Sequence, residues 1–253
     1  MRRSVGWGIL LVAGLPLILW GCLDSKTVLT VNTDGSGTIE QTLYVKSDKE
    51  EKGAKEKGPE EVRAECAKTA ETMGEGVAVK SVTPLEPRGQ WKGFKITYAF
   101  TDITKVKVGF LPPLAASMKT ADKDLLRFEF QGGAQPKLTI VRPALNMGDE
   151  KEEEKEPPAE MLAAFEGARV EFEVRVNGTI TSTNASLVNA EKTGLTLLKE
   201  DIGGLLRDKA AMAALKALAK LKDPKEIRDK LQDAAVKKYV QMEPEERVTI
   251  EFK

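Results

Sequence analysis

The sequence contains no histidine. Histidine is the most common general base near neutral pH and a frequent ligand of zinc. Its absence excludes Ser-His-Asp and Cys-His catalytic arrangements within the chain, and in practice it also excludes zinc sites built from histidine and cysteine. The sequence also lacks a glycine-rich phosphate loop, a paired-cysteine metal motif and a nucleophile elbow. Carboxylate or Ser-Lys chemistry stays formally open, but we expect a protein that is not an enzyme and holds no cofactor or metal.

Cysteine is nearly absent, with only Cys22 and Cys66 in the chain. If Cys22 is modified, Cys66 has no partner, so no disulfide stabilises the fold. Cys66 lies in a helix-like pattern, and a buried free cysteine packs as a small hydrophobic residue. We therefore expect Cys66 to fill the core; the alternative is a reactive or intermolecular thiol.

Neither sign of charge is in excess, because 39 Lys and Arg residues balance 39 Asp and Glu residues. Nucleic-acid binding requires a basic surplus, so we expect no nucleic-acid partner. The length of 253 residues allows one large domain or two small ones.

The one long uncharged run stands at the start of the chain. Two arginines precede an apolar run over residues 5–20, which Gly21 and Cys22 follow. This order is typical of a secretory signal, and the segment LWGC that ends at Cys22 resembles the lipobox of bacterial lipoproteins. The resemblance implies that residues 1–21 are removed and that Cys22 carries a diacylglyceride, with membrane lipid as its partner. Trp20 is bulkier than the residue usual at its position.

Two other interpretations of this start are open. An uncleaved transmembrane anchor needs about 20 apolar residues, and residues 5–20 form a shorter run that contains three glycines and a proline. An ordinary signal peptide with an accidental cysteine is the second alternative. The rarity of cysteine in this chain favours the lipoprotein interpretation.

Residues 22–145 are expected to form a β-rich α+β region that opens with a hairpin. Apolar and polar residues alternate on both sides of the turn Asp34-Gly35-Ser36-Gly37. The same turn resembles the start of an EF-hand loop, but Leu43 stands where the bidentate glutamate is needed, so we expect a plain turn. A charged connector over residues 46–59 follows. The pattern then predicts a helix over 59–73 and strands near 77–82, 94–100, 106–110, 126–130 and 138–141.

Residues 146–158 are rich in acidic residues and are expected to be a solvated linker. Residues 159–253, by themselves or as one domain with 22–145, begin with a short helix over 159–165. They then continue as a strand over 170–176 that an Asn177-Gly178 turn folds back onto 179–183. The glycosylation-like sequons at Asn177 and Asn184 are interpreted as turn chemistry. A strand over 195–198, helices between 205 and 239, of which the second opens at Asp223-Pro224, and a strand over 246–252 complete the chain.

These elements predict an α+β fold, a mainly antiparallel sheet or two smaller sheets with a helical C-terminal segment packed on it. The first C-terminal helix carries lysines beside an apolar face, so packing on the sheet is expected, and a position on a membrane surface is the alternative.

Two segments resemble a family of bacterial envelope lipoproteins of poorly defined function, the LppM-like proteins. One is the hairpin with its DGSG turn just after Cys22, and the other is the stretch VEFEVRVNGTITSTNAS, a strand, a glycine turn, a TNA segment and a further strand. The resemblance covers residues 22–45 and 169–198, with Leu197 or Leu198 in place of a tryptophan. It implies an envelope location and binding of a lipid or a partner, and it brings no catalytic residues.

We therefore expect a membrane-anchored lipoprotein that binds an envelope protein or a lipid without catalysis. A lipid carrier or sensor with an apolar cavity is the alternative, and a hydrolase using Asp201 and Asp208 is a remote one. In lipoproteins, an aspartate directly after the lipidated cysteine can retain the protein in the inner membrane. Here Leu23 precedes Asp24, which favours the outer membrane, with the domain facing the periplasm or the cell surface.

Overall fold

The computed structural model describes residues 23–46, 58–109, 125–143, 163, 165–219, 221, 223–231 and 233–253. The predicted signal sequence, Cys22 and the acidic linker 146–158 lie outside these residues, as does most of the short helix predicted over 159–165. The fold combines helices and strands, with β-structure predominating and divided between two sheets.

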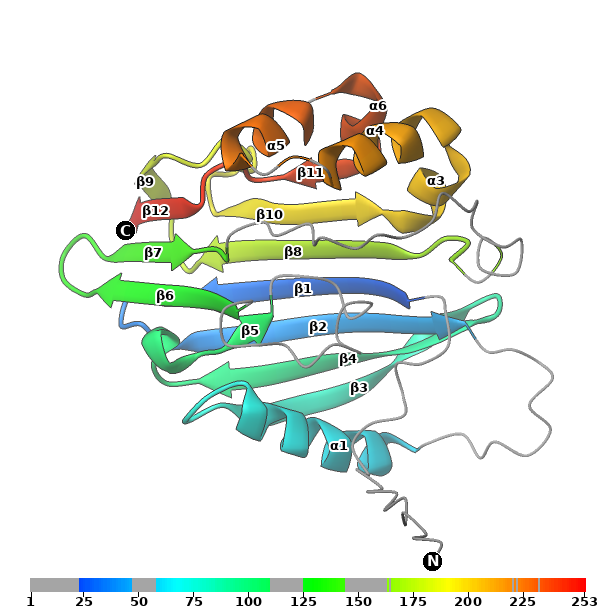
Figure 1. Ribbon diagram of the computed structural model, residues 1–253. Coiled ribbons are helices and arrows are strands. Elements are labelled where there is room, and N and C mark those ends of the chain that lie inside the picture. The colour runs from blue at the N-terminus through cyan, green and yellow to red at the C-terminus, as the bar shows by residue number, and fades with distance from the viewer. Residues whose placement is uncertain are drawn as a thin grey trace, which may run out of the picture.

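A seven-stranded sheet forms the largest part of the molecule (Figure 1). Its strands follow the order β11-β10-β8-β1-β2-β4-β3. The pairs are antiparallel except for β1 and β8, which run parallel. The bounds are β1 (Leu23–Val31), β2 (Gly37–Lys46), β3 (Ala78–Arg88), β4 (Trp91–Phe100), β8 (Arg169–Val176), β10 (Gly194–Asp201) and β11 (Val240–Met242).

A smaller antiparallel sheet has the order β5-β6-β7-β12-β9. Its strands are β5 (Val108–Gly109), β6 (Leu125–Gln131), β7 (Lys137–Val141), β9 (Ile180–Thr183) and β12 (Arg247–Phe252). Both sheets combine strands that precede the predicted linker with strands that follow it.

The α-helices lie at the two edges of the large sheet (Figure 1). Helix α1 (Pro59–Thr72) packs along β3, and the short helix η2 (Ile103–Lys105) contacts β6. Near the opposite edge lie α3 (Ile202–Arg207), α4 (Lys209–Ala219), α5 (Pro224–Leu231) and α6 (Ala234–Lys237). Of these, α5 and α6 contact β11 and α3 contacts β8, and they enclose a small apolar cluster of their own.

The predicted N-terminal hairpin is confirmed, since β1 pairs antiparallel with β2 from Leu23 opposite Val45 to Val31 opposite Gly37. At its turn, the Asp34 carboxylate accepts hydrogen bonds from the backbone N–H and the hydroxyl of Ser36, at 2.9 and 2.6 Å. This is the side-chain turn geometry typical of aspartate, and it engages the carboxylate within the loop.

The predicted hairpin over 170–183 is wrong. Strand β8 pairs with β1 and β10, whereas β9 pairs with β12 in the other sheet. The Asn177 N–H donates to the Val31 carbonyl at 2.8 Å, and a side chain at Gly178 would meet the Lys253 carbonyl oxygen at 2.4 Å. The Asn-Gly turn therefore carries the chain from one sheet to the other, because tertiary contacts override its local preference.

The C-terminal helices are shorter than predicted. The Asp208 carboxylate accepts hydrogen bonds from the N–H groups of Ala210 and Ala211 at 3.0 and 3.1 Å, so it caps α4 and separates it from α3. Asp233 caps α6 in the same way and separates it from α5, which begins at Pro224 as predicted. Strand β11 has three residues and no alternation long enough to predict it.

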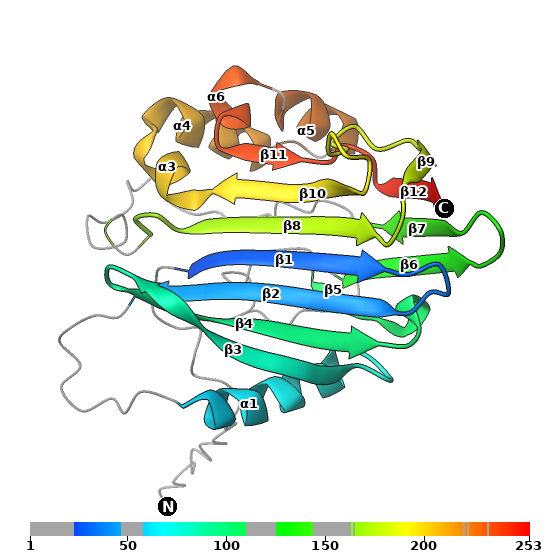
Figure 2. The same cartoon turned by 180° about the vertical axis from the view of Figure 1, so that it is seen from behind.

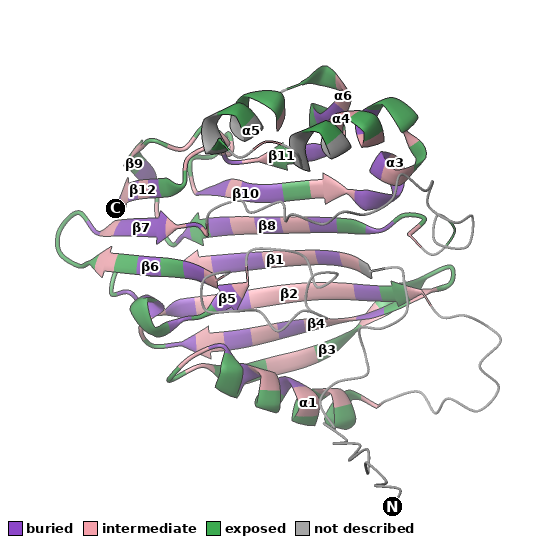
Figure 3. Cartoon of the chain, in the orientation of Figure 1, coloured by how far each residue is buried: buried purple, intermediate pink, exposed green. Residues whose placement is uncertain are grey.

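One apolar core joins the two sheets and α1. Leu29, Ile39 and Tyr98 on the large sheet, with Leu138 and Phe252 on the small one, are almost fully buried. Figure 3 shows buried residues concentrated on the strands and exposed residues on the outer helices. Cys66 is buried in this core on α1, as expected, and burial raises the pKa of its thiol.

Candidate functional site

The face of the large sheet opposite the core is polar. Side chains alternate along a strand, so the apolar residues of β8 point to the core while Arg169, Glu171, Glu173 and Arg175 point to the other face. Figure 2 views the sheet from this side, where β8 and β1 face the viewer and the end of β3 passes over the end of β2. The parallel register sets Lys26 beside Glu171, so charges from distant parts of the chain meet here.

Lys26 lies at the centre of a charge network on this face. Its Nζ atom lies 2.6 Å from Glu173 Oε1 and 3.1 Å from Glu171 Oε1, and Arg175 Nη2 lies 2.6 Å from Glu173 Oε2. Burial raises the pKa of Glu173, but its hydrogen-bonding neighbours outweigh this and lower the pKa to about 2. Burial alone would lower the pKa of Lys26, but the two carboxylates raise it. Both shifts favour the charged forms of Glu173 and Lys26 at neutral pH.

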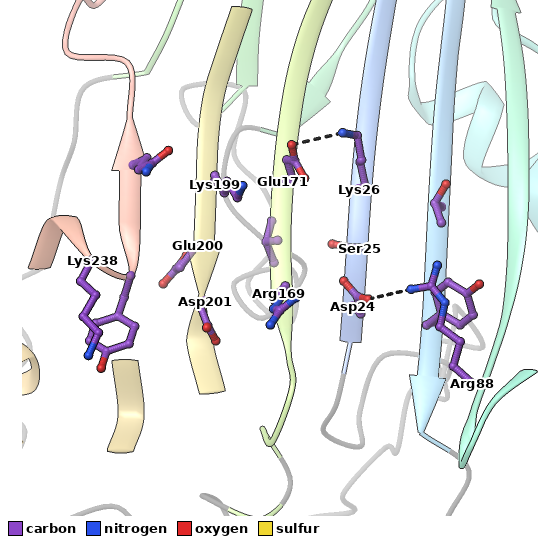
Figure 4. Close-up of a pocket in the computed structure, with 15 residues that line it drawn as sticks. Asp24, Ser25, Lys26, Arg88, Arg169, Glu171, Lys199, Glu200, Asp201 and Lys238 are labelled. Carbon is purple, nitrogen blue, oxygen red and sulfur yellow. Dashed lines mark hydrogen bonds and ion pairs between the residues drawn. The ribbon is translucent and has the colours of Figure 1, made fainter. Parts of the chain in front are cut away.

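A pocket of about 490 Å³ opens on this face, at the end of the sheet where β1 begins (Figure 4). The end of β3 borders it on one side, and the chain around Lys238 and Tyr239, before β11, borders it on the other. Charged residues dominate its lining: Asp24, Lys26, Arg88, Arg169, Glu171, Lys199, Glu200, Asp201 and Lys238.

Arg88 and Tyr44 form one wall of this pocket. The Arg88 guanidinium lies 4.1 Å from the centre of the Tyr44 ring, a cation–π contact, and its Nη1 atom lies 3.7 Å from Asp24 Oδ2. Gly93 makes room for the ring, because a Cβ atom there would stand 2.9 Å from Tyr44 Cδ1. The contact holds an exposed cation at the pocket margin.

Two carboxylic acids of the pocket have raised pKa values. Burial raises the pKa of Asp24, and the nearby Arg88 and Arg169 offset this only in part. Burial also raises the pKa of Glu200, without an opposing cation. Cations and carboxylates therefore face the same space, which suits a polar ligand that carries both charge and hydrogen-bonding groups.

The carboxylates proposed from the sequence for a remote hydrolase act as helix caps. Asp201 Oδ1 accepts a hydrogen bond from the Gly204 N–H at 2.9 Å, and Asp208 Oδ2 accepts one from the Tyr239 hydroxyl at 3.0 Å. Of the two, only Asp201 lines the pocket. The predicted lipidation site, Cys22, lies outside the described residues.

The described residues contain no group of three or more His, Cys, Asp or Glu side chains that could hold a metal ion. Within the same part of the chain, no helix is long and apolar enough to cross a bilayer. The Asn184 amide donates to the Arg247 carbonyl at 2.9 Å and accepts from the Thr249 N–H at 2.7 Å, so this sequon residue is bonded to β12.

No sequence motif marks the pocket residues Arg88, Arg169, Lys199 and Lys238. Alternation over residues 169–176 indicates a charged sheet face, which is a usable signal. It does not indicate that β1 lies beside β8, and this pairing decides which charges meet.

The solved structures that this chain resembles at low similarity include a mycobacterial folded domain and a zinc metallopeptidase. The first is the folded domain of the Mycobacterium tuberculosis LppM protein, with 17% identity, 72% of this chain and 85% of that chain covered, and a TM-score of 0.32. The second is the M1 zinc metallopeptidase of Deinococcus radiodurans, with 13% identity and a TM-score of 0.23, where 70% of this chain matches 39% of that one.

Both TM-scores are too low to support an inference about activity. No family model matches the chain, and no curated protein matches it. For the predicted resemblance to LppM-like proteins, a solved structure of that name is therefore found at low similarity, and no family model supports it.

Proposed function

We propose that this protein is a lipid-anchored lipoprotein of the bacterial envelope whose folded domain binds a charged, polar ligand without catalysis. The observation that carries this proposal is the short distance along the chain between Cys22 and the pocket. Strand β1 begins at Leu23, the residue directly after Cys22, and Asp24 on the same strand lines the pocket. Successive Cα atoms are about 3.8 Å apart, so acylation of Cys22 would hold the pocket next to the bilayer surface.

The chemistry of the pocket supports binding. Its side chains supply cations, carboxylates and the phenol groups of Tyr44 and Tyr239 around one open space. Lys199 is exposed and makes no ion pair with another described residue, and Arg169 is also exposed. Such groups are free to neutralise charge on a ligand, as charge-assisted hydrogen bonds do in many polar sites.

The two alternative functions receive less support. A lipid carrier needs an apolar cavity, whereas charged groups line the described pocket, and the described apolar side chains of the two sheets form one buried cluster. A carboxylate hydrolase would need Asp201 and Asp208 to be available, and both accept backbone hydrogen bonds at helix starts. Placement in the outer membrane, which Leu23 before Asp24 favours, stays part of the proposal.

Intact-mass analysis of the protein from the membrane fraction of a bacterial host tests the anchor. We expect a chain that begins at Cys22 and carries fatty acyl groups, with Cys22→Ser absent from the lipid-modified pool. Cys66→Ser is the matched control, because it removes the other cysteine and leaves lipidation intact. A chain that begins at Met1, or at Cys22 without acyl groups, would overturn the proposal.

Photo-crosslinking in intact cells tests the pocket. A photoreactive amino acid at Gln241, in the pocket lining, should give an adduct that Arg169→Glu abolishes. The control position is Glu71, on the exposed side of α1. Identical adducts from both positions, or an adduct that persists in Arg169→Glu, would count against ligand binding in the pocket.

A further inference from the structure

We infer that the end of the large sheet where β1 begins is a membrane-contact surface, on which the tip of the β3–β4 hairpin lies in the headgroup region of the bilayer. This inference depends on the proposed lipid anchor and specifies how the domain stands on the membrane. It assigns the partner as a lipid bilayer with anionic headgroups.

Strand register defines this surface. Leu23 stands opposite Val45, and Val45 stands opposite Lys92. One step further out, Trp91 lies between Lys46 and Arg88. The row at the very end of the sheet therefore contains a tryptophan flanked by two cations. In both Figure 1 and Figure 2 the hairpin tip reaches beyond the start of β1.

The residue types at this end are those of a membrane interface. Val45 is 42% exposed, and among the described residues it is the exposed large apolar side chain. Trp91 is partly buried, with its ring near Gly167, where a Cβ atom would come within 3.4 Å of it. Tryptophan at the interface with lysine and arginine towards the headgroups is the arrangement that bilayers favour.

The charges at the hairpin tip suit an anionic surface. Lys46, Arg88 and Lys92 lie in the last two rows of these strands, and the Arg88 side chain is 65% exposed. Carboxylates near these cations include Asp24, which already faces Arg88, Glu86 on the same strand as Arg88, and Glu166, whose pKa Lys46 helps Arg207 to lower. Extended lysine and arginine side chains can keep their charges among the headgroups while their stems contact apolar surface.

The opposite end of the strands cannot serve this purpose, because the small sheet packs there. Gly35, in the β1–β2 turn, lies so close to β6 that a Cβ atom would come within 2.8 Å of Phe130. A lipid group on Cys22 would emerge next to Leu23, at the other end. The anchor therefore places the hairpin tip against a bilayer. A protein that bound the same surface would compete with lipid for it.

Tryptophan fluorescence gives a direct test. Two of the three tryptophans, Trp7 and Trp20, lie in the predicted signal, so Trp91 is the single tryptophan of the processed chain. The processed, acylated protein is reconstituted in phosphatidylcholine–phosphatidylglycerol vesicles, with or without brominated acyl chains. We expect roughly a two-fold loss of Trp91 emission with brominated lipid, and emission at shorter wavelength than in detergent.

Co-sedimentation in the same samples separates the two proposals. A protein that fails to sediment with vesicles overturns the anchor, whereas a protein that sediments with unquenched Trp91 overturns only the membrane-contact surface. Unquenched Trp91 in vesicles, together with a crosslink to a protein in native membranes from a photoreactive amino acid at Gln90 of the hairpin tip, would assign the surface to a protein partner and would also overturn it.

Charge variants add a second readout. Arg88→Glu should reduce the quenching in phosphatidylglycerol vesicles, and added salt should reduce it for the unaltered protein. Arg127→Glu is the matched control, because Arg127 is an exposed arginine on β6 of the small sheet. Equal quenching in both variants would contradict the proposed charge contact. The measurement on the unaltered chain decides the main point even if Arg88→Glu folds poorly.

Discussion

At the scale of single residues, the polar face owes its order to charges that the parallel register of β1 and β8 brings together. Lys26 contacts two carboxylates that lie 145 and 147 residues away in the chain. Ion pairs of exposed residues contribute about 0–1 kcal/mol each. A lysine shared by two carboxylates, with Arg175 on the far side of one of them, is a stronger arrangement because one ordered side chain serves several partners.

Titration of Glu173 makes the stability of the fold depend on pH. Its pKa in the folded protein is about 2, below the ordinary value of 4.5, so its ionised form is the one that the fold stabilises. The stabilisation is present above the ordinary pKa and is lost as pH falls from about 5 towards 2. We expect Glu173→Gln to lower the free energy of unfolding at pH 7 by about 1–2 kcal/mol, after allowance for solvent screening, and to flatten the decline in acid.

Urea denaturation of both proteins between pH 7 and pH 2.5, roughly the range over which the carboxylate titrates, measures this effect. Glu40→Gln is the control, since Glu40 pairs with Lys95 on the same face while both side chains are more exposed. Its cost should stay below about 0.5 kcal/mol. Equal costs for the two variants, or an unchanged acid limb in Glu173→Gln, would show that the network adds nothing to the fold.

At the scale of elements, a comparison of two glycine turns distinguishes the cost of backbone strain from the cost of displacing packed side chains. Gly35 has φ +83° and Gly89 has φ +61°, both in the left-handed region where a side chain costs about 1–2 kcal/mol. A Cβ atom at Gly35 would meet Phe130, whereas at Gly89 it would meet nothing within 4 Å. We expect Gly89→Ala to cost about 1 kcal/mol and Gly35→Ala clearly more, because only the second also displaces an aromatic ring of the other sheet.

Thermal and denaturant unfolding of the two alanine variants measures this difference directly, since both carry the same chemical change. The Ile103 N–H donates to the Gly35 carbonyl at 2.9 Å, so the larger cost should be accompanied by faster amide exchange at Ile103. Equal destabilisation would mean that Phe130 yields without cost and that the turn is not a junction between the sheets.

Local elements were predictable from the sequence wherever one local cause dominates. The turn at 34–37, the alternation of β4 and β8, and Pro59 with acidic residues at the start of α1 all act within a few residues. The Asn177-Gly178 turn misled because the Asn177 N–H donates to the Val31 carbonyl, and the next residue, Thr179, bonds to Lys253; both partners are distant in sequence. The helix break at Asp208 was missed because an aspartate within an apolar-periodic segment is equally compatible with a continuous helix.

At the scale of the whole molecule, the prediction of two sheets was within reach, but the membership of each sheet was not. Strand β1 is paired with β2 by a short turn, and it is also paired with β8, which begins more than 130 residues later. The charged pocket follows from that second pairing. The sequence therefore shows the pocket residues as separate charged residues, and it does not indicate that they lie close together in the fold.

The reactivity of one thiol, that of Cys66, can show whether the whole molecule unfolds cooperatively. In the processed chain with Cys22 acylated, Cys66 is the only thiol, and it is buried on α1 in the core that both sheets share. Burial raises its pKa, which further limits the reactive thiolate. Because α1 and the two sheets share one apolar cluster, we expect a thiol reagent to modify Cys66 only through global unfolding, whose free energy is on the order of 5–15 kcal/mol.

The rate of thiol modification against denaturant concentration tests this expectation beside circular dichroism of the same samples. Cooperative opening predicts that the two transitions share one midpoint and one slope. Helix α1 lies at the sheet edge along β3, so the rival outcome is that it detaches first. Modification would then proceed at low denaturant while the sheet signal is unchanged. Cys66→Ala should show no modification, which also checks that Cys22 is blocked, since an unacylated Cys22 would carry a second thiol.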